Sequence, residues 1–79
     1  MENRKTDRQI DMIGYYCPEP VFRLRKELDS MEVGQVVELI GDDPASLEDI
    51  PALCKRTGQE CLEILNEGDH YRFFVKKAV

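Results

Sequence analysis

The chain has 79 residues, of which 42% are hydrophobic, 34% charged and 8% aromatic. This length suits one small domain and excludes a large enclosed active site, because a domain near this size buries only about 60 to 65% of its unfolded surface. Eleven Lys and Arg against sixteen Asp and Glu give a net charge of −5, which argues against direct binding to DNA through its phosphates and favours protein or small-molecule partners.

Thiol and imidazole groups are few: the chain contains Cys17, Cys54, Cys61 and one histidine, His70. Their number and spacing build neither a disulfide framework nor a zinc site, so we expect a reducing compartment and no metal. Residues 1–8 are charged and precede no long apolar stretch, which predicts a flexible N-terminus without a signal peptide or a membrane span. We therefore expect a cytoplasmic protein.

The first half of the chain predicts a strand, a helix and a second strand. Residues 9–13 are a short strand candidate that ends at Gly14. Residues 18–31 predict an amphipathic helix, because apolar side chains recur there at spacings of three and four. These side chains are Val21, Leu24, Leu28 and Met31. Residues 35–40 are rich in β-branched residues and predict the second strand.

The second half predicts another helix and a hairpin. After a turn that ends at Pro44, a second apolar stripe consists of Leu47, Ile50, Leu53 and Cys54. Pro51 lies within this stripe, so the helix either begins near Asp49 or is kinked, and we favour the later or irregular start. Residues 59–66 and 70–77 predict two strands joined by a glycine-containing turn.

The order of the elements predicts an α+β fold, a two-layer βαβαββ sandwich that forms one domain over residues 1–79. Two helices then cover one face of a four-stranded mixed sheet. If the first two strands are parallel, a right-handed crossover brings their carboxyl ends to one edge, and both helices begin there. Ligands of open α/β sheets tend to bind at such an edge.

Cys17 is predicted to lie at the start of the first helix. Pro18 favours an extended conformation at Cys17, as an N-cap residue requires, and Pro18 itself then occupies the first helical position. Pro20 falls within the first turn, where its missing N–H costs no hydrogen bond. Amides of the first turn and the positive end of the helix favour a Cys17 thiolate, whereas the carboxylate of Glu19 opposes it, so we expect a modest net effect.

Three interpretations of Cys17 follow from its position. It can be a lone nucleophile that takes a sulfur atom from a persulfide and passes it on. It can merely cap the helix of a non-catalytic regulatory or adaptor module, although Ser, Thr, Asp or Asn would cap better. It can also belong to a thiol redox protein, an interpretation weakened because Pro20 stands where a nearby resolving cysteine is needed.

Residues 11–20 read Asp-Met-Ile-Gly-Tyr-Tyr-Cys-Pro-Glu-Pro and resemble the Asp-x-x-Gly-x-x-Cys-Pro-x-Pro signature of the TusA/SirA-like sulfur-carrier family. Gly14, Pro18, Glu19 and Pro20 support Cys17 in this motif. The resemblance extends from about Ile10 to Lys77, and residues 42–44 and 49–51 favour the TusA branch. Tyr15 and Tyr16 depart from the Leu-Arg pair that is common in the family, which bears on the choice of partner.

The resemblance implies a sulfurtransferase-like carrier rather than an autonomous enzyme. Such a protein needs no cofactor and holds sulfur as a transient persulfide on Cys17. The sulfur comes from a cysteine desulfurase, a rhodanese or another persulfide donor protein and goes to an acceptor protein. The pathway stays open between tRNA thiolation to 2-thiouridine, molybdenum-cofactor maturation, sulfur oxidation and selenium metabolism.

The surface around Cys17 is a candidate docking site. Residues 1–26 carry six basic and four acidic residues, whereas residues 27–69 carry two and twelve. Arg23 and Lys26 are therefore expected to steer an acidic partner, or else to form an ordinary solvated helix face. An apolar docking rim is expected from Tyr15, Tyr16 and Phe22.

Other polar and thiol groups have simpler interpretations. We expect Cys54 and Cys61 to pack as small hydrophobic residues. Asp43 is expected to be a helix N-cap with a minor binding role near Cys17, and His70 a surface residue beside a turn.

Overall fold

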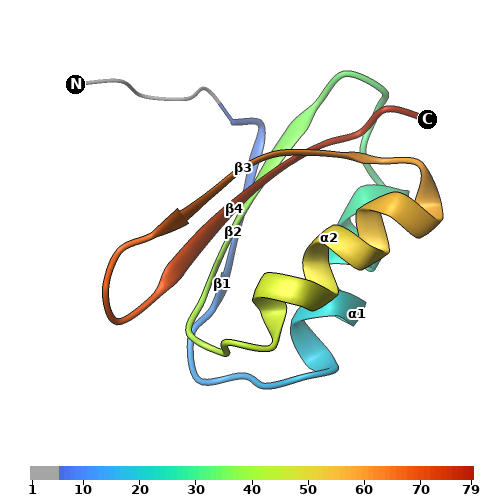
Figure 1. The fold of residues 1–79 in the computed structure, drawn as a ribbon. Helices are drawn as coiled ribbons and strands as arrows, with labels where there is room; N and C mark the ends of the chain where they lie inside the picture. Colours follow the sequence, from blue (N-terminus) through green and yellow to red (C-terminus); the bar gives the residue numbers. More distant parts are fainter. Residues whose placement is uncertain (1–5) are drawn as a thin grey trace.

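The computed structural model describes residues 6–79, which contain four strands and two helices in the predicted order. The elements are β1 (Arg8–Met12), α1 (Glu19–Asp29), β2 (Val36–Gly41), α2 (Ser46–Thr57), β3 (Glu60–Asn66) and β4 (Tyr71–Lys76). Both helices cover the same face of one sheet (Figure 1). The predicted two-layer α+β fold is confirmed.

The sheet has the strand order β1-β2-β4-β3. β1 and β2 are parallel, and the other two neighbouring pairs are antiparallel, so the sheet is mixed as predicted. In the parallel register Met12 lies opposite Gly41, the last residue of β2. The carboxyl ends of these two strands therefore meet at one edge, and α1 and α2 both begin beyond it (Figure 1).

The hydrophobic core lies between the sheet and the helices. Its fully buried members come from both helices and from β1, β2 and β4: Ile10, Leu24, Val37, Leu39, Ile50, Leu53, Phe73 and Val75. Each buried large aliphatic or aromatic side chain contributes about 1.5 to 3 kcal/mol of transfer free energy. Phe74 alternates with Phe73 and Val75 and so belongs to the face that the helices leave uncovered, yet it is only 6% exposed.

The start of α2 differs from the prediction. The helix begins at Ser46, before Asp49, and Pro51 lies inside it. An early turn forms because Ser46 and Leu47 donate their N–H groups to the carbonyls of Asp43 and Pro44, at 2.9 and 3.0 Å. Since Pro51 lies in the second turn, its missing N–H removes one bond from a helix that has already started.

The N-terminal segment was expected to be flexible over residues 1–8, and the first five of them lie outside the described residues. Asp7 and Arg8 both form bonds with neighbouring elements. The N–H of Asp7 donates to the Val36 carbonyl at 2.8 Å, and the Asp7 carboxylate accepts the Val36 N–H at 2.8 Å. Arg8 forms an ion pair with Glu27 at 2.9 Å. Because these bonds extend the parallel ladder, β1 begins at Arg8 rather than at residue 9.

The β3–β4 turn carries a network of charged side chains. His70 lies between two carboxylates, with Nδ1 2.6 Å from Asp69 Oδ1 and Nε2 2.9 Å from Glu67 Oε1. The hydrogen bond to Asp69, and next that to Glu67, raises the pKa of His70 above its ordinary value of 6.5. Hydrogen bonds from Arg72 and from His70 lower the pKa values of Glu67 and Asp69, respectively, so both carboxylates are ionised where His70 titrates.

We expect His70→Gln to flatten the pH dependence of stability on the alkaline side. Protonated His70 stabilises the hairpin fully below pH 6.5, and this contribution is lost as the pH rises through the higher pKa of the folded state. The effect is small because solvent screens these exposed groups. The test is to measure the thermal midpoint of both proteins as the pH rises from 6.5. If the two midpoints change with pH in parallel, the prediction is contradicted.

Candidate functional site

The loop that carries Cys17 lies between β1 and α1, beside the β2–α2 connection (Figure 1). Three carboxylates accept hydrogen bonds from its amides. Asp11 binds the N–H of Ile13 at 3.0 Å, Asp42 that of Gly14 at 3.0 Å, and Asp43 that of Cys17 at 2.7 Å. Two of these aspartates come from the end of the neighbouring strand, so the parallel pairing of β1 and β2 holds the cysteine loop in place.

Gly14 permits the sharp turn out of β1. Its φ is +87°, in the left-handed region that side chains with a Cβ rarely adopt. No atom lies within 4 Å of a Cβ built at this position, so the backbone conformation rather than space requires glycine. The turn closes with a hydrogen bond from the N–H of Tyr15 to the carbonyl of Met12, at 3.1 Å.

Asp43 connects the two helix starts. Its second carboxylate oxygen accepts the N–H of Ala45 at 3.1 Å, and its carbonyl accepts the N–H of Ser46 at 2.9 Å. The residue is therefore not the N-cap itself, which is Ala45, but it orders the turn that precedes α2. The same side chain anchors the backbone of Cys17, and it is 9% exposed.

Cys17 is not the N-cap of α1, which corrects the prediction by one residue. The helix begins at Glu19, and Pro18 is its N-cap, with the Pro18 carbonyl accepting the N–H of Phe22 at 3.1 Å. The N–H of Glu19 donates to the Tyr16 carbonyl at 2.9 Å and so is not directed at the sulfur. Pro20 occupies the first turn as predicted, and its ring is buried. The Cys17 side chain is exposed.

Carboxylates, rather than the helix end, determine the electrostatics of the Cys17 thiol. A hydrogen bond to Asp49, then partial desolvation, and then the charges of Asp49 and Asp43 raise the pKa of Cys17 above its ordinary value. Glu19, the carboxylate expected to oppose the thiolate, is not among these causes. The resting thiol is consequently protonated at neutral pH, which limits its reaction with small electrophiles.

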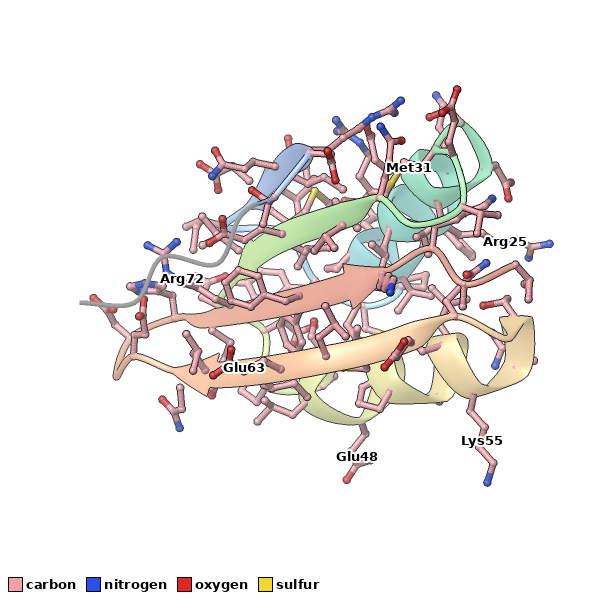
Figure 2. All side chains as sticks on the ribbon, turned by 90° about the horizontal axis from the view of Figure 1, so that it is seen from above. Arg25, Met31, Glu48, Lys55, Glu63 and Arg72 are labelled. Atoms are coloured by element: carbon pink, nitrogen blue, oxygen red, sulfur yellow. The ribbon has the colours of Figure 1, made fainter. Side chains whose placement is uncertain are left out.

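We expect Asp49→Asn to make Cys17 more reactive, because it removes the carboxylate that stabilises the protonated thiol. Each drop of one in the pKa raises the thiolate fraction about tenfold, and the lower nucleophilicity reduces the gain in rate to about threefold. Alkylation by iodoacetamide as a function of pH measures this change. Glu48→Gln is the control, since this carboxylate of the same helix points into solvent (Figure 2). Identical pH profiles for Asp49→Asn and the parent protein would refute the assignment.

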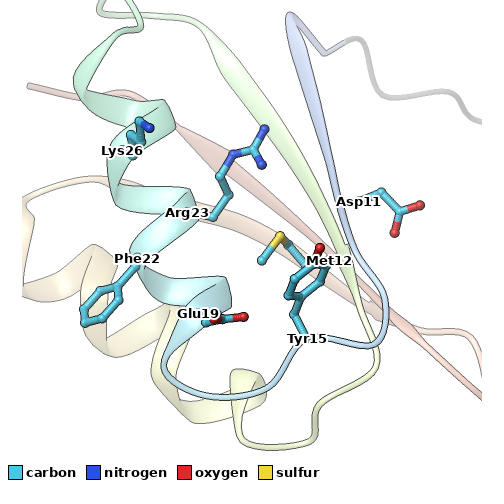
Figure 3. Close-up of a pocket in the computed structure, with 7 residues that line it drawn as sticks. All are labelled: Asp11, Met12, Tyr15, Glu19, Phe22, Arg23 and Lys26. Atoms are coloured by element: carbon cyan, nitrogen blue, oxygen red, sulfur yellow. The ribbon is translucent and has the colours of Figure 1, made fainter.

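A cleft of about 420 Å³ lies between α1 and β1, next to the cysteine loop. It is lined by Asp11, Met12, Tyr15, Glu19, Phe22, Arg23 and Lys26. In Figure 3 the side chains of Met12, Tyr15 and Arg23 lie between the helix and the strand. Four of the five predicted docking residues therefore share one surface, and Tyr16 alone of them does not line the cleft.

The rim of this surface exposes large apolar side chains. Tyr16 is 61% and Phe22 63% exposed, and Tyr15 is exposed as well. Arg23 lines the same cleft, and its Nε lies 3.6 Å from Glu27 Oε1 on the next helical turn. Exposed aromatic rings next to a cation are typical of protein interfaces.

Two further findings concern the residues that the structure describes. Within residues 6–79, no group of three or more His, Cys, Asp or Glu side chains is placed to hold a metal ion. Neither of the described helices has the length and apolar character needed to cross a membrane.

The sequence matches the family model of sulfurtransferase TusA over residues 8–77. A candidate sulfur carrier protein of Archaeoglobus fulgidus is 50% identical over 72 residues, which are 91% of this chain and 94% of that protein. The sulfur carrier protein TusA of Allochromatium vinosum is 40% identical over 72 residues, 91% of this chain and 95% of that one. The crystal structure of a SirA-like protein from Desulfitobacterium hafniense superimposes with a TM-score of 0.78 and 26% identity, covering 91% of this chain and 99% of the other.

Proposed function

Because the chain belongs to the TusA sulfurtransferase family, we propose that it is a sulfur carrier that holds sulfane sulfur as a persulfide on Cys17. The observation that carries the proposal is the position of Cys17. Its thiol is exposed at the edge where two parallel strands end, while its backbone N–H is held by Asp43. The loop is thus anchored, and the sulfur is free to enter a partner's active site.

The transfer is a thiol exchange that needs no cofactor. The Cys17 thiolate attacks the outer sulfur of a donor persulfide, a new S–S bond forms, and the donor's cysteine leaves as a thiolate. The reverse exchange passes the sulfur to an acceptor. Since Asp49 and Asp43 raise the pKa of Cys17, the free carrier is a weak nucleophile, and we expect the charges of a docked partner to favour the thiolate.

The partners that fit this role are proteins. We propose a cysteine desulfurase or rhodanese-type protein as the donor, and an acceptor on the route to 2-thiouridine in tRNA, in the cytoplasm. The chain acts as a carrier rather than as an autonomous enzyme. The docking surface consists of Tyr16 and four residues of the cleft: Tyr15, Phe22, Arg23 and Lys26.

The test is to load the protein from a persulfide-bearing desulfurase and to measure the mass of its peptides. Trypsin places each cysteine in a separate peptide: residues 9–23 for Cys17, 27–55 for Cys54 and 57–72 for Cys61. We expect peptide 9–23 alone to gain one sulfur atom, which a reducing thiol removes. An unchanged mass, or a gain on either of the other peptides only, would overturn the proposal.

A further inference from the structure

The other two cysteines form a pair. Cys54, near the end of α2, is buried, and Cys61, at the start of β3, is half-buried and packs against the same core. Their thiols hydrogen-bond to each other. The prediction that both pack as small apolar residues is therefore incomplete, because it did not pair the two thiols.

The contact is built by the turn between α2 and β3. Gly58 has a φ of +80° and ends the helix, donating its N–H to the carbonyl of Cys54. The N–H of Gln59 donates to the same carbonyl at 2.9 Å. The chain therefore reverses within a few residues, and β3 begins beside the last turn of α2.

This pair is remote from Cys17. Across the sheet, Cys61 is in register with Val75, and Val75 with Val37, near the start of β2. The loop of Cys17 lies beyond the opposite end of β2, at Gly41, four residues further along the strand. At about 3.3 Å a residue, the two sites are separated by more than about 13 Å.

We propose that Cys54 and Cys61 are a modification site that closes to an intramolecular disulfide on reaction with a peroxide, independently of Cys17. The Cys61 thiolate attacks a peroxide oxygen, the O–O bond breaks, and a sulfenic acid and one water form. Cys54 then attacks the Cys61 sulfur, the S–S bond forms, and a second water leaves. The two thiols lose two electrons and two protons in total, and the peroxide is reduced to two molecules of water.

The exposure and the pKa of each thiol both indicate that Cys61 reacts with the peroxide and that Cys54 resolves the sulfenic acid. Cys61 is the more exposed thiol, and the hydrogen bond from Cys54 lowers the pKa of Cys61. The same hydrogen bond, followed by burial, raises the pKa of Cys54, which suits a resolving thiol that attacks second. Because β3 begins beside the last turn of α2, both thiols already lie against the same part of the core when the S–S bond forms.

The experiment uses the full-length Cys17→Ser protein, which retains only this pair, treated with hydrogen peroxide. We expect peptides 27–55 and 57–72 to be recovered joined together, with the loss of two hydrogen atoms and of both titratable thiols. Two unmodified thiols, or a sulfinic acid on Cys61 beside a free Cys54, would overturn the proposal.

The parent protein and a single variant supply the controls. In the parent protein we expect the same cross-link while peptide 9–23 still reacts with an alkylating agent, and a cross-link that includes Cys17 would contradict independence. In Cys54→Ala no resolving thiol remains, so Cys61 is expected to proceed to sulfinic acid. Because loading through Cys17 is scored on a different peptide, failure of this proposal leaves the proposed sulfur carriage untouched.

Discussion

Cys17→Ser is expected to abolish sulfur loading completely and to leave the fold unchanged. A hydroxyl oxygen cannot form the S–S bond of a persulfide, so peptide 9–23 gains no sulfur atom. The structure loses little, because the side chain is exposed and forms no capping hydrogen bond, while the bond to Asp43 comes from the backbone N–H. We expect the free energy of unfolding to change by no more than about 0.5 kcal/mol.

The two parts of this prediction are measured separately. The mass of the tryptic peptides reports loading, and thermal or urea unfolding reports stability. Cys61→Ser is the matched control, since it removes a thiol remote from the edge and should load as the parent protein does. Retained loading in Cys17→Ser, or its loss in Cys61→Ser, would show that another thiol carries the sulfur.

Local pattern was sufficient to predict the fold. The apolar stripe through Leu24 and Leu28 and that through Ile50 and Leu53 each mark one face of a helix, and these faces are the ones the core buries. Strand boundaries were close for the same reason, since Val37 and Leu39 alternate with neighbours of the opposite face. Periodicity reports which face is buried, and in a two-layer fold that nearly determines the packing.

Local sequence pattern could not predict which carboxylates act on the Cys17 thiol. Asp49 and Asp43 act on Cys17 only because the parallel strands bring the β2–α2 connection and the first turn of α2 beside the cysteine loop. Their sequence separation from the thiol carries no periodic signal, whereas Glu19 is only two residues from Cys17 and is therefore the carboxylate that local pattern indicates. The predicted crossover did indicate that Asp43 lies near Cys17, because it placed the starts of both helices at one edge of the sheet.

The helix starts show how side chains and carbonyls override propensity. Pro18 predicted an extended Cys17 as N-cap, but the Tyr16 carbonyl accepts the first free amide and moves the start of α1 by one residue. For α2, Asp43 orders the preceding turn, and the helix begins early enough to include Pro51. In both places a hydrogen bond in the loop, and not the sequence of the helix, determines the boundary.

Reversing two charges on the docking surface, in the double variant Arg23→Glu and Lys26→Glu, is expected to slow partner-dependent sulfur transfer more than about tenfold at low salt. Both side chains line the cleft next to the exposed aromatic rim, within the basic part of an acidic chain. Their charges accelerate encounter with an acidic partner, so the variant also loses most of the salt dependence of the rate. Loading of Cys17 by a small persulfide donor should change little, because that reaction needs no docked protein.

A control with the same change of net charge separates docking from general repulsion. Arg25 and Lys55 are exposed basic residues that extend into solvent (Figure 2), and neither lines the cleft, so Arg25→Glu with Lys55→Glu should leave transfer near the parent rate. The docking variant gives up one ion pair, that of Arg23 with Glu27, worth about 0.3 to 0.5 kcal/mol, so it remains folded. The measurement is the transfer rate of the parent protein and of both double variants at several salt concentrations. If the control pair slows transfer as much as the docking pair does, the partner binds a different face of the molecule.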